Sequence, residues 1–115
     1  MEFKTHLDQK INSNGTSYVG EIDANFSDLL VIFGDPTSGD GYKTDAEWEL
    51  LFEDGTIATI YNWKNGKNYE GNSGVDTEEI TDWHIGGNSN KALERVEEVL
   101  KENLNKKPKK RKTRV

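Results

Sequence analysis

The sequence predicts an α+β domain, in which a small antiparallel β-sheet packs against a short helix and a C-terminal helix. Three observations predict this class. Residues 46–63 have the pattern of a central β-hairpin, and residues from about 25 to 33 have a helical spacing of apolar side chains. Residues from about 89 to 104 repeat that spacing over a longer stretch. The expected order of elements is strand, helix, three strands and helix.

The N-terminal region predicts only weak structure. Apolar residues at intervals of four predict a short helix there, and they are Phe3, Leu7 and Ile11. The turn-rich residues 12–15 follow. A short strand is then expected from three apolar positions, Tyr18, Val19 and Ile22.

The next element is predicted to be a helix over residues 25–33. Its apolar residues fall at i, i+3, i+4 and i+7, and they are Phe26, Leu29, Leu30 and Phe33. Asp23 or Asn25 can cap its start, while Gly34 and Pro36 stand where a helix ends. A buried strand over residues 29–33 is the alternative, and the capping residues favour the helix.

The central hairpin is predicted from two apolar runs that flank Asp54-Gly55. A two-residue turn at that dipeptide places Leu50 opposite Thr59 and Trp48 opposite Tyr61. The core face would then contain Trp48, Leu50, Phe52, Ile57, Thr59, Tyr61 and Trp63. Two loops rich in Gly flank the hairpin, at residues 34–45 and 64–78.

A short strand is expected over residues 80–85, and Gly86-Gly87 is expected to end it. Asn88 or Ser89 can cap the C-terminal helix. The apolar stripe of that helix contains Leu93, Val96, Leu100 and Leu104.

Charge divides the 115 residues into two parts. Residues 106–115 hold seven basic residues and no acid, whereas residues 1–105 carry a net charge of −13. We therefore expect a single acidic α+β domain over 1–105 and a basic disordered tail over 106–115. The basic residues are Lys106, Lys107, Lys109, Lys110, Arg111, Lys112 and Arg114. This tail resembles a short nuclear-import signal. Attachment to phosphate backbones and a merely solubilising end are the alternatives.

The sequence argues against several kinds of chemistry. It has no cysteine, which excludes disulfides and thiolate sites. It contains no hydrolase or phosphate-loop motif. Asp35, Asp40 and Asp45 do not have the spacing of a calcium loop, so a solvated turn is favoured over a metal site. His84 could act as a general base, but His6 is the only other histidine. We expect no enzyme, no metal and no cofactor.

Aromatic and polar residues near the two Gly-rich loops suggest a binding surface. If these loops meet at one end of the sheet, they would form a recognition rim. The candidate binding residues are Asp40, Tyr42, Lys43, Trp63, Lys67, Tyr69, Trp83 and His84. The alternative is that these aromatic residues only pack the edge of a small sheet.

Several phrases of the chain resemble small uncharacterised proteins of bacteriophages and large DNA viruses. The resemblance covers residues from about 30 to 100. Its phrases are Phe33-Gly34-Asp35-Pro36, Asp40-Gly41-Tyr42-Lys43-Thr44-Asp45-Ala46-Glu47-Trp48, Asp54-Gly55-Thr56, Thr59-Ile60-Tyr61-Asn62-Trp63-Lys64 and Trp83-His84-Ile85-Gly86-Gly87. It implies a viral accessory protein and supplies no catalytic residue.

Together these features predict a non-enzymatic binding module. The acidic domain would contact a basic surface of a host or viral protein. The tail would direct the protein to the nucleus of a eukaryotic host or add electrostatic attachment. One alternative is a nucleic-acid-associated protein that binds through the tail. The other is a small-molecule or nucleotide binder that uses the loop aromatics.

An intracellular location without a membrane span is expected. Residues 1–10 lack the apolar stretch of a signal peptide, and the longest apolar run, 29–33, is too short to span a bilayer. Homodimerisation would be one way to bury more surface.

Overall fold

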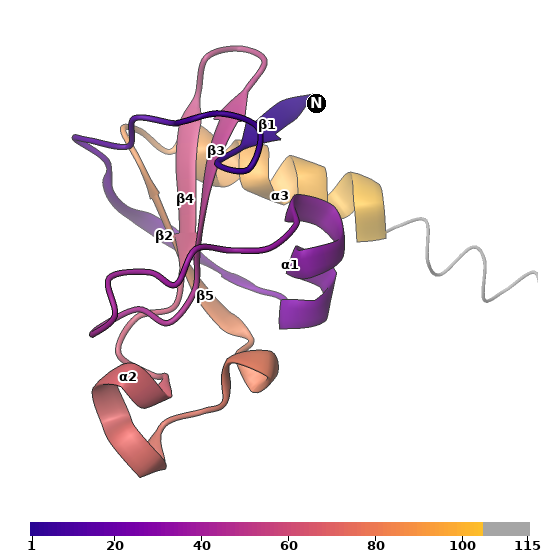
Figure 1. Ribbon diagram of the computed structural model, residues 1–115. Helices are drawn as coiled ribbons and strands as arrows, with labels where there is room; N and C mark the ends of the chain where they lie inside the picture. Colours follow the sequence, from indigo (N-terminus) through magenta and orange to yellow (C-terminus); the bar gives the residue numbers. More distant parts are fainter. Residues whose placement is uncertain (105–115) are drawn as a thin grey trace, which may run out of the picture.

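Five strands form one antiparallel sheet in the computed structural model, which describes residues 1–104 (Figure 1). The strands lie in the order β1-β3-β4-β5-β2, and every neighbouring pair is antiparallel. Their bounds are β1 Phe3–Thr5, β2 Ser17–Asp23, β3 Glu47–Phe52, β4 Ile57–Tyr61 and β5 Asp82–Gly87. The early strand β2 is thus the partner of the late strand β5.

Helices α1 (Phe26–Phe33) and α3 (Lys91–Leu104) cover one face of this sheet (Figure 1). The α+β prediction is confirmed, and so are both predicted helices. The predicted loop 64–78 also contains a helical turn, α2 (Lys67–Glu70), and 3-10 turns at Gly71–Ser73 and Thr77–Glu79. No helix within residues 1–104 is both long enough and apolar enough to cross a membrane.

The hydrophobic core lies between the sheet and these two helices. The alternation in β3 sends Trp48, Leu50 and Phe52 into it, and all three are buried. Trp48 and Trp83 also bury their indole rings, whose N–H groups need acceptors. Trp48 Nε1 donates to the Gly34 carbonyl at 2.8 Å, and Trp83 Nε1 donates to the Ala24 carbonyl at 3.0 Å. These bonds attach the segments flanking α1 to the sheet.

The ends of α1 follow the predicted signals in part. Asn25 is the N-cap residue, but its side chain makes no capping hydrogen bond. At the other end, Gly34 has a φ of 85° and its N–H donates to the Leu30 carbonyl at 2.8 Å. The positive φ favours glycine at this position and ends the helix there.

The register of the central hairpin differs by one residue from the predicted one. Trp48 pairs with Ile60, and not with Tyr61. The turn contains three residues, 53–55, because Phe52 and Thr56 close it through a 2.8 Å hydrogen bond. Gly55 has a φ of 89°, as expected for the left-handed residue that ends such a turn.

This shift leaves the predicted core face of β3 intact and reverses that of β4. Ala58 and Ile60 face the core and are fully buried. Ile57 and Tyr61, which were predicted to be core residues, lie on the opposite face and are half-buried. Because side chains alternate along a strand, a shift of one residue exchanges the two faces.

The predicted N-terminal helix is wrong, since residues 3–5 form the edge strand β1. Phe3 pairs with Phe52, and its ring packs edge-on against Phe33 at 5.2 Å between centroids. Leu7 is 59% exposed, so the three apolar residues do not form one stripe. The contact of Phe3 with the core outweighs a helical spacing that had no caps.

Gly86 and Gly87 continue β5 instead of ending it. Gly86 pairs with Tyr18 of β2 and with Thr59 of β4. A Cβ at Gly86 would lie 2.5 Å from Thr59 Oγ1. The Thr59 side chain therefore leaves room only for glycine at position 86. Glycine within a strand can mark such a close approach as well as the end of the strand.

Candidate functional site

The face of the sheet opposite α1 and α3, hereafter the open face, carries polar and aromatic side chains. Direct cross-strand neighbours form a first row of Glu47, Tyr61, His84 and Glu21. The next row contains Glu49, Thr59, Gly86 and Tyr18. The segment 6–16 lies against the second row, where Ser13 Oγ donates a 2.8 Å hydrogen bond to the carboxylate of Glu49.

Two shallow depressions lie side by side on the open face. The first has a volume of about 220 Å³ and is lined by polar residues together with Glu47, Tyr61 and Trp63. The second has a volume of about 380 Å³ and is lined by Tyr18, Tyr61, Trp63 and His84. Tyr61 and Trp63 form the wall that the two depressions share.

Glu47 is a half-buried carboxylate in the first depression. No ion pair of Glu47 is formed with another residue from 1 to 104. Burial, followed by the negative charges of Glu49 and Asp40, raises the pKa of Glu47 above its ordinary value. Within residues 1–104, Glu47 is thus a carboxylate without an ion-pair partner, beside two aromatic rings.

Four rings pack against one another along the open face. The His84 ring lies 4.9 Å from Tyr18, 5.7 Å from Tyr61 and 6.3 Å from Trp63, measured between centroids. Trp63 is 39% exposed, whereas Trp48 and Trp83 are fully buried. Trp63 is therefore the tryptophan through which a bound ligand can be detected.

The two predicted loops do meet at one end of the sheet. Lys64 N donates to the Lys43 carbonyl at 2.8 Å, and the rings of Tyr42 and Tyr69 lie 5.2 Å apart. Lys43 and Lys64 place their ammonium groups 5.4 and 5.5 Å from the centroid of Trp63. This part of the rim therefore combines aromatic rings with basic side chains.

Buried Asn62 joins these loops. Its side-chain oxygen accepts from the N–H groups of Asp45 and Ala46 at 2.7 and 3.1 Å. Its side-chain nitrogen donates to Asp45 Oδ1 at 2.9 Å and to Asn65 Oδ1 at 3.0 Å. With four hydrogen bonds, Asn62 fixes the relative position of both loops where they leave the hairpin.

Asp40 and Asp45 serve the loop structure. Asp40 Oδ1 accepts from the N–H groups of Tyr42 and Thr44 at 2.8 and 3.0 Å, and these bonds lower the pKa of Asp40. Asp45 binds Asn62 as above and also accepts from Asn68 N at 3.1 Å. These contacts support the prediction of a turn over that of a metal site formed by the loop aspartates.

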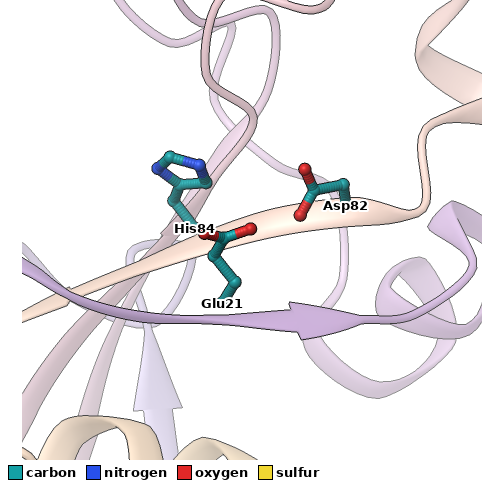
Figure 2. Close-up of side chains that lie close together, drawn as sticks. All are labelled: Glu21, Asp82 and His84. Carbon is teal, nitrogen blue, oxygen red and sulfur yellow. The ribbon is translucent and has the colours of Figure 1, made fainter.

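At the other end of the first row, Glu21 lies close to Asp82 and His84 (Figure 2). The candidate ligand atoms of these three residues all lie within 4.8 Å of one another. Tyr18 Oη donates a 2.7 Å hydrogen bond to Glu21 Oε2. We refer to the three residues as the Glu21–Asp82–His84 cluster.

Known proteins add no further constraint. The chain matches no family model, no curated protein and no solved structure. The resemblance to phage and large-virus proteins, and what it implies, therefore stays a prediction.

Most of the predicted binding residues lie on the surface, with one clear exception. Trp83 was predicted at the rim but is fully buried in the core, because β5 continues beyond it and its side chain faces the helices. Lys67 lies on α2 and forms an ion pair with Asp76 at 3.3 Å. The predicted basic tail, 106–115, lies outside the described residues.

The structure adds Glu47, Tyr61, Tyr18, Glu21 and Asp82 to the candidate residues. Tyr61 was assigned to the core through the wrong register. Glu21 could not be placed beside His84, because no signal in the sequence pairs β2 with β5. Glu47 could have been found from the alternation in β3, because it precedes buried Trp48 and therefore lies on the other face of the sheet.

Proposed function

We propose that this protein is a binding module that takes up a lysine or arginine side chain of a partner protein on its open face. The observation that carries the proposal is Glu47, a half-buried carboxylate with no counterion within residues 1–104. Partial burial of an unpaired charge is costly, so a cationic group that reaches Glu47 would offset part of this cost by forming an ion pair.

The aromatic wall beside Glu47 supports the same ligand. Tyr61 and Trp63 line the depression that contains Glu47. A cation over an aromatic ring gains from about 0.5 to about 2 kcal/mol, depending on desolvation. Within the fold, the ammonium groups of Lys43 and Lys64 already lie over the Trp63 ring, which shows that this ring interacts with cations, and Trp63 remains 39% exposed.

A nucleotide or another planar anion is the second candidate ligand. The observation in its favour is the rim, where Lys43 and Lys64 lie over Trp63 and Lys64 also lies 5.4 Å from the Tyr69 ring centroid. A base could stack on these rings while a lysine binds its phosphate. Glu47 and Asp40 would repel that phosphate, and for this reason we favour the cationic ligand.

The test is a titration followed by nuclear magnetic resonance, in which backbone and indole N–H shifts locate even weak binding. The probes are N-acetyl-lysine methylamide, N-acetyl-arginine methylamide and adenosine monophosphate. The proposal predicts saturable shifts at Glu47, Tyr61 and Trp63 with the two cations. Glu47→Gln should remove them, and Glu97→Gln, an equal change on the exposed side of α3, should not.

Two results would reject the proposal. One is the absence of saturable shifts at these residues with either cation. The other is equal affinity of the Glu47→Gln variant and the unaltered protein. Shifts with adenosine monophosphate at Trp63 and Tyr69, without shifts from the cations, would replace the cationic ligand with the second candidate.

For the basic residues 106–115, nuclear targeting or electrostatic attachment is proposed from the sequence alone. The test compares the full chain with a 1–105 truncation, each fused to a fluorescent protein in eukaryotic cells. Loss of nuclear accumulation in the truncated protein supports targeting. Equal distribution of both proteins, with equal retention on DNA-cellulose at low salt, excludes both roles.

A further inference from the structure

The Glu21–Asp82–His84 cluster brings together two strands that are far apart in the sequence. Glu21 on β2 is the direct cross-strand partner of His84 on β5. Asp82 precedes His84 by two positions on the same strand, so both side chains emerge on the open face. Figure 2 shows the two carboxylates and the imidazole gathered over the β2–β5 pair.

The two carboxylates of the cluster lack a positively charged partner within residues 1–104. No lysine or arginine of this range forms an ion pair with Glu21 or Asp82. With His84, the two carboxylates therefore form a place that a metal cation could occupy.

The imidazole of His84 is held in place without using its nitrogens. Its ring packs against Tyr18, Tyr61 and Trp63. Among the hydrogen bonds within residues 1–104, none involves a ring nitrogen of His84, whereas His6 binds the Asp35 carbonyl through Nε2 at 2.9 Å. The neighbouring rings therefore fix the orientation of the His84 imidazole, and its nitrogens remain available to coordinate a metal ion.

We propose that Glu21, Asp82 and His84 bind a divalent transition-metal ion of the Zn²⁺ type. One imidazole nitrogen and two carboxylate oxygens are ligands that zinc accepts, and three protein ligands leave a position for water. Magnesium and calcium prefer sets made of oxygen alone. This site does not depend on the proposed recognition of a cationic side chain, since Glu47 is not one of its ligands.

The distances are compatible with this assignment after small side-chain movements. Two ligand atoms of a tetrahedral zinc ion, each about 2.1 Å from the metal, lie about 3.4 Å apart. The candidate atoms lie within 4.8 Å of one another before any ion is bound. Rotation about side-chain torsions can supply the difference, because Glu21 and Asp82 are exposed. Tyr18 would act as a positioning residue by holding Glu21 through its hydroxyl.

The test is isothermal titration calorimetry of the full chain with Zn²⁺, complemented by the visible absorption of bound Co²⁺. We expect one saturable site. Glu21→Gln, Asp82→Asn and His84→Gln should each weaken the affinity by more than about tenfold, because even the loss of an outer partner of a ligand costs about that much. Near-ultraviolet circular dichroism of buried Trp48 and Trp83 verifies that each variant is folded.

The controls are His6→Gln, which removes the other histidine, and Glu97→Gln on α3. Both should keep the affinity of the unaltered protein. Affinity should also fall with acidification, because protons compete for all three ligands. Absence of saturable Zn²⁺ and Co²⁺ binding would overturn the proposal. Equal affinity of the cluster variants and the unaltered protein, or an equal loss in His6→Gln, would do the same.

Discussion

Arg95 of α3 donates a 2.8 Å hydrogen bond from Nε to Asp54 Oδ2 in the turn between β3 and β4. Asp54 Oδ1 also accepts from Thr56 N at 3.0 Å. Hydrogen bonds from Thr56 and then from Arg95 hold the pKa of Asp54 far below its ordinary value of 3.8. Asp54 therefore connects the C-terminal helix, through Arg95, to the turn that sets the hairpin register.

The first prediction concerns acid stability. A carboxylate whose pKa is lowered on folding stabilises the folded state fully at any pH above the pKa that it has in the unfolded chain. This contribution is lost as the pH falls from there through the lower pKa of the folded state. Asp54→Asn should therefore lower the free energy of unfolding near neutral pH, by an amount that shrinks below pH 3.8. Urea unfolding of Asp54→Asn and of the unaltered protein, at neutral pH and below pH 3.8, measures the difference in unfolding free energy. A difference that does not change with pH would contradict it, and Asp76→Asn provides the control.

The second prediction tests the register of the hairpin. Ile60 is fully buried against the helices, whereas Ile57 is half-buried on the open face. Ile60→Ala should cost about 2–5 kcal/mol of unfolding free energy, as buried truncations do, and Ile57→Ala should cost about 1 kcal/mol or less. Denaturant unfolding of both variants decides between the registers, because the two-residue turn requires the opposite order.

The third prediction concerns Gly55, whose φ is 89°. Among residues 1–104, no atom lies within 4 Å of a Cβ built there, so a side chain meets strain only from the backbone. Gly55→Ala should destabilise the protein by about 1–2 kcal/mol, and Gly55→Asn should cost less because Asn tolerates this conformation better. Thermal unfolding would show the ranking. Equal stability of all three proteins would refute the three-residue turn.

The fourth prediction concerns the charge of Glu47. A carboxyl group whose pKa is raised on folding destabilises the folded state once the pH exceeds its ordinary value of 4.5. Glu47→Gln should therefore raise the melting temperature at neutral pH and lose this advantage near pH 4. Glu97→Gln serves as the control. A lower melting temperature of Glu47→Gln at neutral pH would show that Glu47 is compensated within the fold.

The fifth prediction concerns Tyr18 and the proposed metal site. Tyr18→Phe keeps the ring beside His84 but removes the hydroxyl that donates to Glu21. Zinc affinity should fall about tenfold, which is typical for the loss of an outer partner of a ligand. Calorimetry measures the change, and Tyr42→Phe is the matched control. Unchanged affinity would remove Tyr18 from the site.

Those parts of the fold that depend on local pattern could be predicted. The helical spacing from Phe26 to Phe33 identified α1, and the stripe that includes Val96 and Leu100 identified α3. The meeting of the two loops could also be predicted, because they leave the hairpin at the same end. Trp63 was assigned both to the core face of the hairpin and to the binding rim. Its 39% exposure contradicts the first assignment and agrees with the second.

The register and the cluster could not be predicted, for two physical reasons. Ile57 and Ile60 lie on opposite faces of β4, so its apolar pattern does not select one face, and Asp54-Gly55 fits turns of either length. The pairing of β2 with β5 depends on packing over a long sequence separation. Without it, Glu21 had no reason to be placed beside His84, and no metal site was expected.

The three-residue turn between β3 and β4 has a consequence for how this chain can vary in length. Exposed loop tips generally tolerate insertions, and β-hairpins occur with loops of several lengths. A residue added to or removed from 53–55 can therefore be absorbed within the loop while Leu51 still pairs with Ile57. Because that pairing decides which face each residue of β4 takes, such a change should leave Tyr61 on the open face and Ile60 in the core, whereas a slip of the pairing itself by one residue would exchange them.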